Sequence, residues 1–373
     1  MRVLLLHNRY RHQGGEERAV HDIAELLRRR GDTVEVLERS SADAGRARAA
    51  QGMLSGGVDP DEVFHRARRM RADVVHAHNV HPLLGWRALA AARSAGARTV
   101  LHLHNFRLFC AIAIAYHDGG PCFRCRGTDT RPGLRLRCRG SLAEAAVYAA
   151  GLHRQQPRFY EQVNRFIAVS RATAARLESL GLVTDRTVVL PNFVFGDGFA
   201  RTSAADRGEY ALVSGRLVEE KGFDTAIAAA RAASVPLAIA GDGPDEGRLR
   251  GLAAGADVRF AGRLSQTALA GVRERAGVVL VPSRWEEPCP YAVLDALAAG
   301  VPVLAGKLGG LPELVGAEAT LPPDDAGAWG RALGDLWHDP ARRREQGDAG
   351  LARARELFSA ERYYDGLMRA YAA

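Results

Sequence analysis

One stretch of this chain, residues 282–315, constrains its fold more than any other; it reads PSRWEEPCPYAVLDALAAGVPVLAGKLGGLPELV. It follows an apolar run, residues 278–281, that predicts a buried parallel strand. A polar turn, a helical pattern over residues 291–299 and a second apolar run over residues 301–305 come next. Strand, turn, helix and strand in this order predict part of a parallel α/β sheet.

Two carboxylates in this stretch, Glu287 and Asp295, stand eight residues apart with a predicted helix start between them. The spacing puts one acid at the loop tip and the other about one turn into the helix, so both can face the same cleft. The helix N-terminus can bind a phosphate or a sugar hydroxyl. Gly309 and Gly310 offer a second place where backbone N–H groups meet an anion. Taken alone, such acids are more often a helix cap and a solvated surface residue.

Length and composition predict two domains of ordinary size. The chain has 373 residues, of which 47% are hydrophobic and 25% charged. The net charge is +8, but the arginines are spread among acids, so we do not expect a nucleic-acid partner. No apolar run is long enough to span a membrane, and residues 1–6 are too short for a signal peptide. We expect a cytoplasmic protein.

In the first half, strands alternate with helices, which predicts a parallel, doubly wound sheet whose ligand site lies at the carboxyl ends of the strands. The expected strands are residues 3–6, 33–37, 73–76, 99–103, 165–169 and 187–190. The expected helices are residues 16–29, 83–95, 142–152 and 170–180, and residues 40–71 are expected to be helical or loose.

Two pairs of residues follow strand ends in this half. Gly14 and Gly15 precede the first helix, in a geometry that suits either a phosphate or a plain tight turn. His78 and His104 follow the third and fourth strands. A histidine in such a place is more often a hydrogen-bonded structural group than a catalytic one, and the histidines two residues earlier are expected to be structural.

An insertion at residues 106–140 holds four of the five cysteines, which are Cys110, Cys122, Cys125 and Cys138. A reducing cytosol disfavours disulfides. Four thiolates could bind a structural Zn²⁺ and fold a segment that has no core of its own. Because the segment has a single C-x-x-C and its outer cysteines are widely spaced, four ordinary reduced thiols are an equal alternative.

The basic cluster Arg131–Arg139 precedes an apolar helical stretch. It could make a peripheral contact with anionic lipid on the inner face of the membrane, or bind an anionic acceptor. A solvated loop in front of a core helix is the more common explanation of such a pattern.

The second half begins after residues 193–209, which have little periodicity. We therefore expect an N-terminal domain at residues 1–196, a C-terminal domain at 197–356 and a terminal helix at 357–373. A new strand at 210–215 precedes Arg216 and Lys221, and two cations there suit a diphosphate, both bound and as a leaving group. Arginine is used almost everywhere else in this chain, so lysine at 221 indicates a need for a compact ammonium group.

These motifs resemble the donor-binding signature of the retaining glycosyltransferases of family 4. That signature is a Glu, seven residues and a second Glu, followed by Ala-x-Ala-x-Gly-x-Pro-Val and Gly-Gly-x-x-Glu. Here it runs from Glu287 to Glu313, with Asp295 in place of the second Glu, which shortens the reach by one methylene. The string Gly-Arg-Leu-x-x-x-Lys-Gly at residues 215–222 resembles the pyrophosphate-binding motif of the same family.

The resemblance implies the α/β GT-B fold, with two Rossmann-like doubly wound domains facing across a cleft. It implies that Arg216 and Lys221 stabilise the departing diphosphate, that Glu287 binds donor-sugar hydroxyls, that Asp295 holds the ribose and that His104 lies at the reacting centre. The donor-binding residues implied are Gly14, Gly15, Arg216, Lys221, Arg263, Leu264, Glu287, Pro288, Cys289, Pro290, Tyr291, Asp295, Gly309 and Gly310.

We therefore expect a metal-independent, retaining hexosyltransferase that moves a sugar from a nucleotide-diphosphate sugar to the hydroxyl of a glycan, a lipid-linked acceptor or a small natural product. The expected mechanism is front-face transfer, with the leaving diphosphate assisting deprotonation of the acceptor and domain closure excluding water. The alternatives are a GT-B epimerase or phosphorylase, and a non-catalytic nucleotide-sugar-binding protein.

Overall fold

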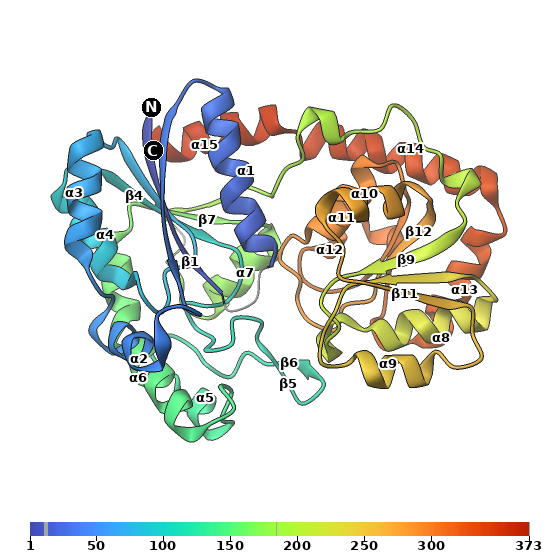
Figure 1. Ribbon diagram of the computed structural model, residues 1–373, viewed down its shortest axis with the longest axis horizontal. Coiled ribbons are helices and arrows are strands. Elements are labelled where there is room, and N and C mark those ends of the chain that lie inside the picture. The colour runs from blue at the N-terminus through green and yellow to red at the C-terminus, as the bar shows by residue number, and fades with distance from the viewer. Residues whose placement is uncertain (11–13, 184, 373) are drawn as a thin grey trace. The chain divides into compact units, whose positions relative to one another are not determined.

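A computed structural model of the protein describes residues 1–10, 14–183 and 185–372 (Figure 1). The chain forms two compact units. The first unit contains residues 1–117, 122–191 and the chain from Tyr364 onward, and the second contains residues 118–121 and 192–363. The chain thus passes to the second unit after Pro191 and returns to the first within its last helix. Residues 11–13 of the loop predicted to carry Gly14 and Gly15 lie outside the described residues.

The first unit is built on a six-stranded sheet in the order β2-β1-β3-β4-β7-β8. Its strands are β1 (Arg2–Arg9), β2 (Thr33–Ser40), β3 (Val74–Ala77), β4 (Arg98–Leu103), β7 (Arg165–Ala168) and β8 (Thr187–Val189). Every neighbouring pair is parallel, which confirms the predicted sheet. Residues 3–6 of β1 are wholly buried, as expected for a central strand covered on both faces. Outside this sheet, β5 (Tyr116–His117) and β6 (Gly120–Pro121) form a separate two-stranded sheet.

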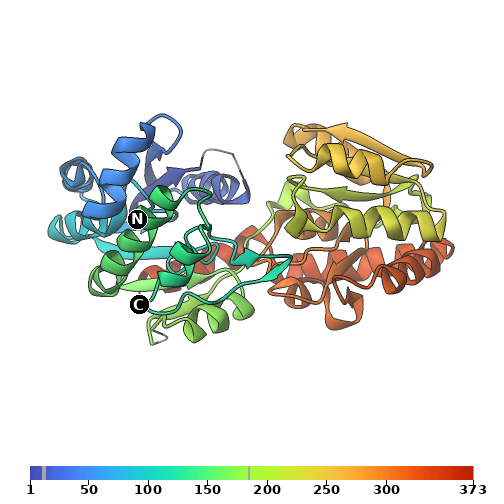
Figure 2. The same cartoon turned by 90° about the horizontal axis from the view of Figure 1, so that it is seen from below.

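Helices cover both faces of this sheet (Figures 1 and 2). They are α1 (Gly15–Arg29), α2 (Gly45–Ser55), α3 (Pro60–Met70), α4 (Gly85–Ser94), α5 (Arg131–Arg135), α6 (Leu142–Gln162) and α7 (Arg171–Ser179). Ser170 caps α7 by accepting a hydrogen bond of 3.1 Å from the backbone N–H of Thr173, which confirms the predicted helix start. The stretch 40–71 folds as two helices, α2 and α3.

The second unit has its own six-stranded parallel sheet, in the order β11-β10-β9-β12-β13-β14. Its strands are β9 (Tyr210–Ser214), β10 (Leu237–Ala240), β11 (Val258–Gly262), β12 (Ala276–Val281), β13 (Val303–Gly306) and β14 (Thr320–Leu321). Its helices are α8 (Phe223–Ala233), α9 (Glu246–Leu252), α10 (Gln266–Glu274), α11 (Tyr291–Ala298), α12 (Leu311–Val315), α13 (Ala326–Trp337) and α14 (Pro340–Leu357). Its core joins the sheet to α8 and α13 through fully buried residues such as Ile239, Val278 and Trp329.

The strand order fixes where a ligand can bind in each unit. In an open parallel sheet, ligands bind beyond the carboxyl ends of the strands, at the point where the strand order reverses. The order reverses between β1 and β3 in the first unit and between β9 and β12 in the second. The loops that follow these four strands are therefore the places to look for a site.

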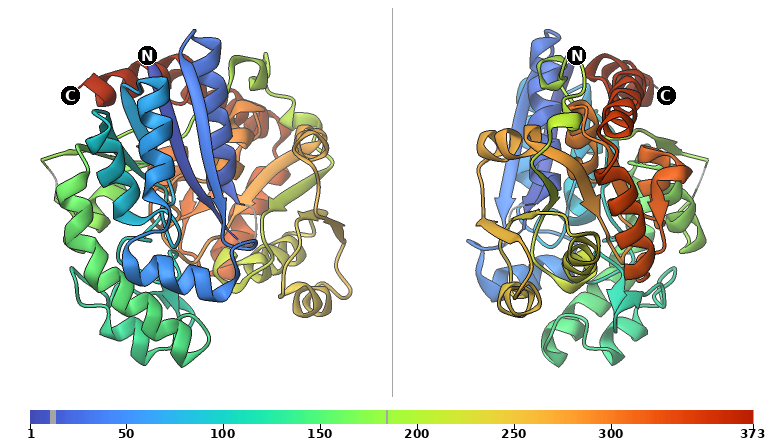
Figure 3. Two further views of the ribbon diagram at one scale, coloured as in Figure 1. Left: turned by 60° about the vertical axis from the view of Figure 1, so that its left-hand side comes forward. Right: turned by 90° about the vertical axis from the view of Figure 1, so that its right-hand side faces the viewer.

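The last helix, α15 (Ala360–Ala372), completes the first unit from Tyr364 onward. Figure 3 shows its dark red end beside the blue strands of that unit. The hydroxyl of Tyr371 lies 2.8 Å from Nδ1 of His76 on β3, and the hydroxyl of Tyr364 donates to Asp32 at 3.1 Å. Among the described residues, no helix is long and apolar enough to cross a bilayer.

Candidate active site

An ion pair marks the switch point of the second unit. Lys221 follows β9 and Glu287 follows β12, and Lys221 Nζ lies 2.5 Å from Glu287 Oε1. The hydroxyl of Ser283 donates to the same oxygen at 2.7 Å. The Glu287 side chain is 3% exposed, whereas that of Lys221 is 28% exposed. An ammonium group has three donors, so the bond to Glu287 leaves donor capacity for a ligand oxygen on the open side.

The backbone segments around this pair pack so closely that two positions leave no room for a side chain. Gly222 adopts φ +68°, in the left-handed region, and a Cβ there would collide with the backbone of Pro282. Gly309 adopts φ +57°, and a Cβ there would lie 2.6 Å from the carbonyl oxygen of Glu287. The N–H of Gly310 donates to that carbonyl at 2.7 Å. The loops after β9, β12 and β13 thus hold one another in register, and glycine is the residue that permits it.

Arg216 comes from the same loop as Lys221, directly after β9. Its side chain is 52% exposed, and its guanidinium lies 3.4 Å from Glu220 Oε1. Glu220 is buried, and its carbonyl accepts the N–H of Arg284 at 2.8 Å, which ties this loop to the one after β12. Arg216 therefore presents an exposed cation on the same loop as Lys221.

Asp295 lies inside α11 and is nearly buried. Its Oδ2 accepts a hydrogen bond of 3.1 Å from Arg273, and both side chains are 10% exposed. The idea that this carboxylate holds a ribose stays a prediction, and in this structure one of its oxygens is engaged by an arginine.

The remaining donor-side residues surround the start of α11 and the end of β11. Pro290 occupies the N-cap position of α11, and the carbonyl of Cys289 accepts from Asn192 at 2.9 Å. Burial raises the pKa of the Cys289 thiol to about 12, so that group is neither a nucleophile nor a charge. Arg263 is exposed and Leu264 half-buried just beyond β11. Pro288 and Tyr291 are buried.

In the first unit, Gly14 and Gly15 begin α1 as predicted, but a carboxylate of the chain itself binds there. Glu17 Oε2 accepts the N–H of Gly14 at 2.7 Å, and Glu17 Oε1 accepts that of Tyr10 at 3.1 Å. Burial raises the pKa of Glu17, but hydrogen bonds from His7 and from these N–H groups lower it by more. The net pKa shift is therefore downward. A donor phosphate at this turn would have to compete with Glu17.

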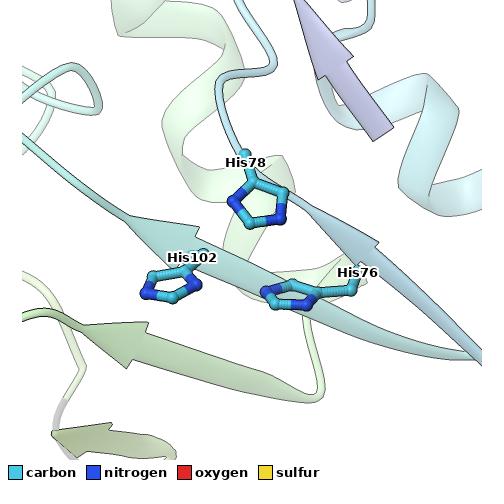
Figure 4. A group of neighbouring side chains, drawn as sticks. All are labelled: His76, His78 and His102. Carbon is cyan, nitrogen blue, oxygen red and sulfur yellow. The ribbon is translucent and has the colours of Figure 1, made fainter. Parts of the chain in front are cut away.

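His78 and His104 lie in a layer of stacked rings. Figure 4 shows His76 and His102 on neighbouring strands, with His78 beyond them at the end of β3. The ring centroids of His76 and His102 are 5.3 Å apart with an interplanar angle of 11°, and those of His102 and His104 are 4.2 Å apart at 22°. His78 Nδ1 and His104 Nε2 share a hydrogen bond of 2.9 Å.

These rings are uncharged. Burial, with smaller contributions from neighbouring histidines, lowers the pKa of His104 to about 3 and that of His78 well below its ordinary value. A neutral His104 can donate or accept a hydrogen bond, but it carries no positive charge at neutral pH. The ligand nitrogens of His76, His78 and His102 lie within 4.8 Å of one another, close enough to hold a metal ion. Their stacking favours a packed layer of neutral rings, because ligands of one ion aim their lone pairs at a single point.

A buried polar network beside this layer was not predicted. Glu16 Oε2 accepts hydrogen bonds from the hydroxyl of Tyr10 at 2.8 Å and from Asn105 Nδ2 at 3.0 Å. The guanidinium carbon of Arg107 lies 5.2 Å from the centre of the Tyr10 ring. Burial raises the pKa of Glu16. The acid directly after Gly14-Gly15 and the Asn directly after His104 are visible in the sequence, but no sequence pattern links the two.

The predicted cysteine and arginine groups lie in the segment between β4 and α6. Cys110, Cys122, Cys125 and Cys138 line one small cavity of the first unit, and all four are free thiols. In the basic cluster, Arg131 pairs with Asp129 at 2.9 Å and Arg139 pairs with Glu144 at 2.7 Å. Helix α6, which follows the cluster, buries residues such as Tyr148 and Leu152 against the rest of the unit, as a core helix does.

Solved structures share this architecture over the whole chain. A sucrose-phosphate synthase from Thermosynechococcus elongatus superposes with a TM-score of 0.74 at 19% identity, covering 100% of this chain and 98% of that one. HepE from Anabaena, solved in complex with UDP, superposes with a TM-score of 0.69 at 18% identity and covers 100% of both chains. Two Rossmann-like units with parallel six-stranded sheets define the GT-B fold of glycosyltransferases, which confirms the predicted fold class.

Sequence comparison identifies the family. The family model described as Glycosyltransferase Family 4 matches residues 13–195, and the one described as Glycosyl transferases group 1 matches residues 198–353. The 2-deoxystreptamine N-acetyl-D-glucosaminyltransferase of Streptomyces fradiae is 30% identical over 301 residues, which is 74% of this chain and 66% of that protein. The chain belongs to the GT4-type glycosyltransferases. In two further relatives the match spans only 19% and 42% of their own length.

Proposed function

We propose that this protein is a retaining glycosyltransferase that moves a hexose-type sugar from a nucleotide-diphosphate sugar to an acceptor hydroxyl. The observation that carries the proposal is the Lys221–Glu287 pair at the switch point of the second unit. An ammonium group with open donors suits a diphosphate oxygen. The carboxylate beside it, fixed by Ser283, suits the hydroxyls of the sugar attached to that diphosphate.

In this mechanism the chain itself stabilises the leaving group. Arg216 and Lys221 neutralise charge on the diphosphate as the glycosidic bond breaks. His104, uncharged, is a hydrogen-bond partner for a hydroxyl at the reacting centre. The proposed front-face transfer passes the acceptor proton to the departing diphosphate. Asp295 and the backbone of residues 288–291 are proposed to hold the ribose and the sugar.

The direct test is a product screen. The protein is incubated with UDP-, GDP- and dTDP-sugars and a panel of glycan, lipid-linked and small aglycone acceptors, and the products are identified by mass spectrometry. UDP-sugars come first because HepE, which shares the fold, was solved with UDP. A glycosylated acceptor and a free nucleoside diphosphate are expected.

Each alternative has its own product in this screen. An isomerised nucleotide sugar would indicate an epimerase, a sugar phosphate formed with inorganic phosphate would indicate a phosphorylase, and donor binding without turnover would indicate a binding protein. The anomeric configuration of the product, measured by NMR, decides between retention and inversion. If no divalent ion takes part, adding Mg²⁺ or Mn²⁺ changes kcat/KM by less than about two-fold.

A further inference from the structure

The proposed function leaves one chemically distinctive part of the molecule unused, the segment that carries four cysteines. Cys110, Cys122, Cys125 and Cys138 span 29 residues of the first unit, yet all four line a single cavity of about 20 Å³. A cavity of this size holds about one water-sized particle. The other walls are mostly apolar, with Phe109 and Leu136 among them. We propose that these four cysteines bind one structural Zn²⁺ ion.

The thiols are close enough to affect one another. Burial, with contributions from Cys110, Cys138 and Cys122, raises the pKa of Cys125 to about 11. Cysteine binds zinc as a thiolate, so thiol protons are released to solvent when the metal binds. Among the described residues, the only three ligand atoms within 4.8 Å of one another belong to the histidines of Figure 4. The four sulfur atoms are therefore not yet close enough to coordinate one ion. Zinc binding requires the cysteine side chains to change their χ1 rotamers, which cysteine can do.

The charge of the segment matches such a site. Four thiolates and one Zn²⁺ carry a net charge of about −2. Residues 122–139 contain six arginines and one aspartate, so the segment that carries these cysteines is itself strongly basic. This gives the basic cluster a local role that needs neither a lipid nor an anionic acceptor. With four sulfur ligands the ion has no open position, so it is structural and takes no part in transfer.

A bound ion would also explain how the segment keeps its shape. Regular structure is sparse between β4 and α6, where the longest element is the five-residue helix α5. Four non-glycine residues there, Ala113, Ala115, Asp118 and Arg137, adopt positive φ angles of 73°, 49°, 51° and 48°. Such backbone persists only where the surroundings hold it, and a metal that joins Cys110 to Cys138 would hold both ends of the segment.

The experiment measures metal content in the full-length protein, purified without a histidine tag or chelator. Elemental analysis is expected to find about one zinc per chain. Cys122→Ser and Cys125→Ser should each reduce this at least about five-fold. Two control variants should retain the metal. Cys289→Ser removes the cysteine buried in the second unit. His102→Gln removes one of the three histidines that could otherwise hold a metal ion.

A second measurement covers the case in which the serine variants do not fold. In the wild-type protein, Co²⁺ substitution should produce the near-ultraviolet thiolate charge-transfer band of a tetrahedral sulfur site. Chelation should make four cysteines reactive to alkylation that are protected before it. The inference is wrong if the native protein holds well under one zinc, if zinc survives both serine variants, if it is lost in His102→Gln, or if mass analysis finds disulfides among these cysteines.

Discussion

At the scale of single residues, the proposed function depends most directly on the ion pair between Lys221 and Glu287. Lys221→Ala removes the ammonium that would face the diphosphate and leaves a carboxylate that is 3% exposed without its cation. We expect kcat/KM to fall by at least about two orders of magnitude, or about 3 kcal/mol of transition-state stabilisation. Glu287→Gln should cause a comparable loss.

Two further variants sharpen this prediction. Lys221→Arg keeps the charge but replaces the compact ammonium with a planar guanidinium group. It should therefore retain only a small part of the wild-type activity. Arg250→Ala, on α9, removes an exposed cation paired with Glu246 and should leave kcat/KM unchanged. Steady-state kinetics with the donor found in the product screen decides. Near-wild-type turnover in both Lys221→Ala and Glu287→Gln would show that this pair is not part of the active site.

The hydroxyl of Tyr371 gives a second prediction at this scale, concerning stability. It lies 2.8 Å from His76 Nδ1, and both groups are buried. Tyr371→Phe leaves a buried ring nitrogen without its partner, which should lower the free energy of unfolding by about 1–2 kcal/mol. Tyr160→Phe is the control, because the bond from Tyr160 to the carbonyl of Gly181 is exposed and water can replace it. A change within about 0.5 kcal/mol is expected there, and equal effects of the two variants on urea denaturation would contradict the argument.

The residues that sequence could identify differ from those it could not in how local their pattern is. Lys221 and Glu287 each stand in a dense local motif, so they were predicted, and the fold brings them to 2.5 Å. The Glu16 network was missed because Asn105 lies 89 positions from Glu16 and meets it only after β1 and β4 enter one sheet. The pairing of Asp295 with Arg273 was missed for the same reason, since 22 positions separate them.

At the scale of elements, the turn between β13 and α12 depends on Gly309. Its φ is +57°, and a Cβ added there would lie only 2.6 Å from the carbonyl oxygen of Glu287, which leaves no room for alanine. Gly309→Ala should therefore lower the free energy of unfolding by at least about 1–2 kcal/mol and weaken donor binding by displacing the Glu287 loop.

The matched control for this turn is Gly247→Ala. Gly247 lies in α9, and a Cβ there meets nothing within 4 Å. Alanine should stabilise that helix by about 0.5–1 kcal/mol. Thermal unfolding and donor titration are measured for both variants. A loss in Gly309→Ala alone would show that the turn, and not alanine substitution in general, causes the effect. Equal behaviour of the two variants would mean that the turn is not strained.

Elements were predictable where apolar residues recur with a clear period. The strands β3, β4 and β7 are short apolar runs, and each was predicted close to its observed limits, whereas β14 was not predicted. Residues 40–71 became α2 and α3 without a definite prediction, since α2 is rich in Ala, Arg and Gly and buries few side chains. Helix α6 continues through Pro157, to Gln162, although a proline usually predicts a break. Tertiary packing, which a local pattern does not contain, decides such cases.

At the scale of the whole molecule, the layer of neutral histidines makes stability depend on pH. Burial lowers the pKa of His76 and His104 to about 3, whereas an unfolded histidine titrates near about 6.5. As the pH falls below about 6.5, the unfolded chain therefore takes up protons that the folded chain refuses. The stability present above that pH is lost progressively toward pH 3, by up to about 1.4 kcal/mol per pH unit for each such histidine.

This dependence can be measured and assigned. Hydrogen exchange of peptides covering β3 and β4, corrected for the intrinsic exchange rate, reports the stability of the first unit between about pH 7 and pH 5. His102→Gln removes one ring whose pKa burial holds well below its usual value, so the slope should decrease by about one proton. His65→Gln, which removes an exposed ring on α3, should leave the slope unchanged. Glu16 acts in the opposite direction, because its raised pKa lets the folded unit gain a proton first. Equal slopes in the wild type and His102→Gln would show that the layer is solvated or charged, and His104 would then not be the neutral hydrogen-bond partner that the proposed mechanism requires.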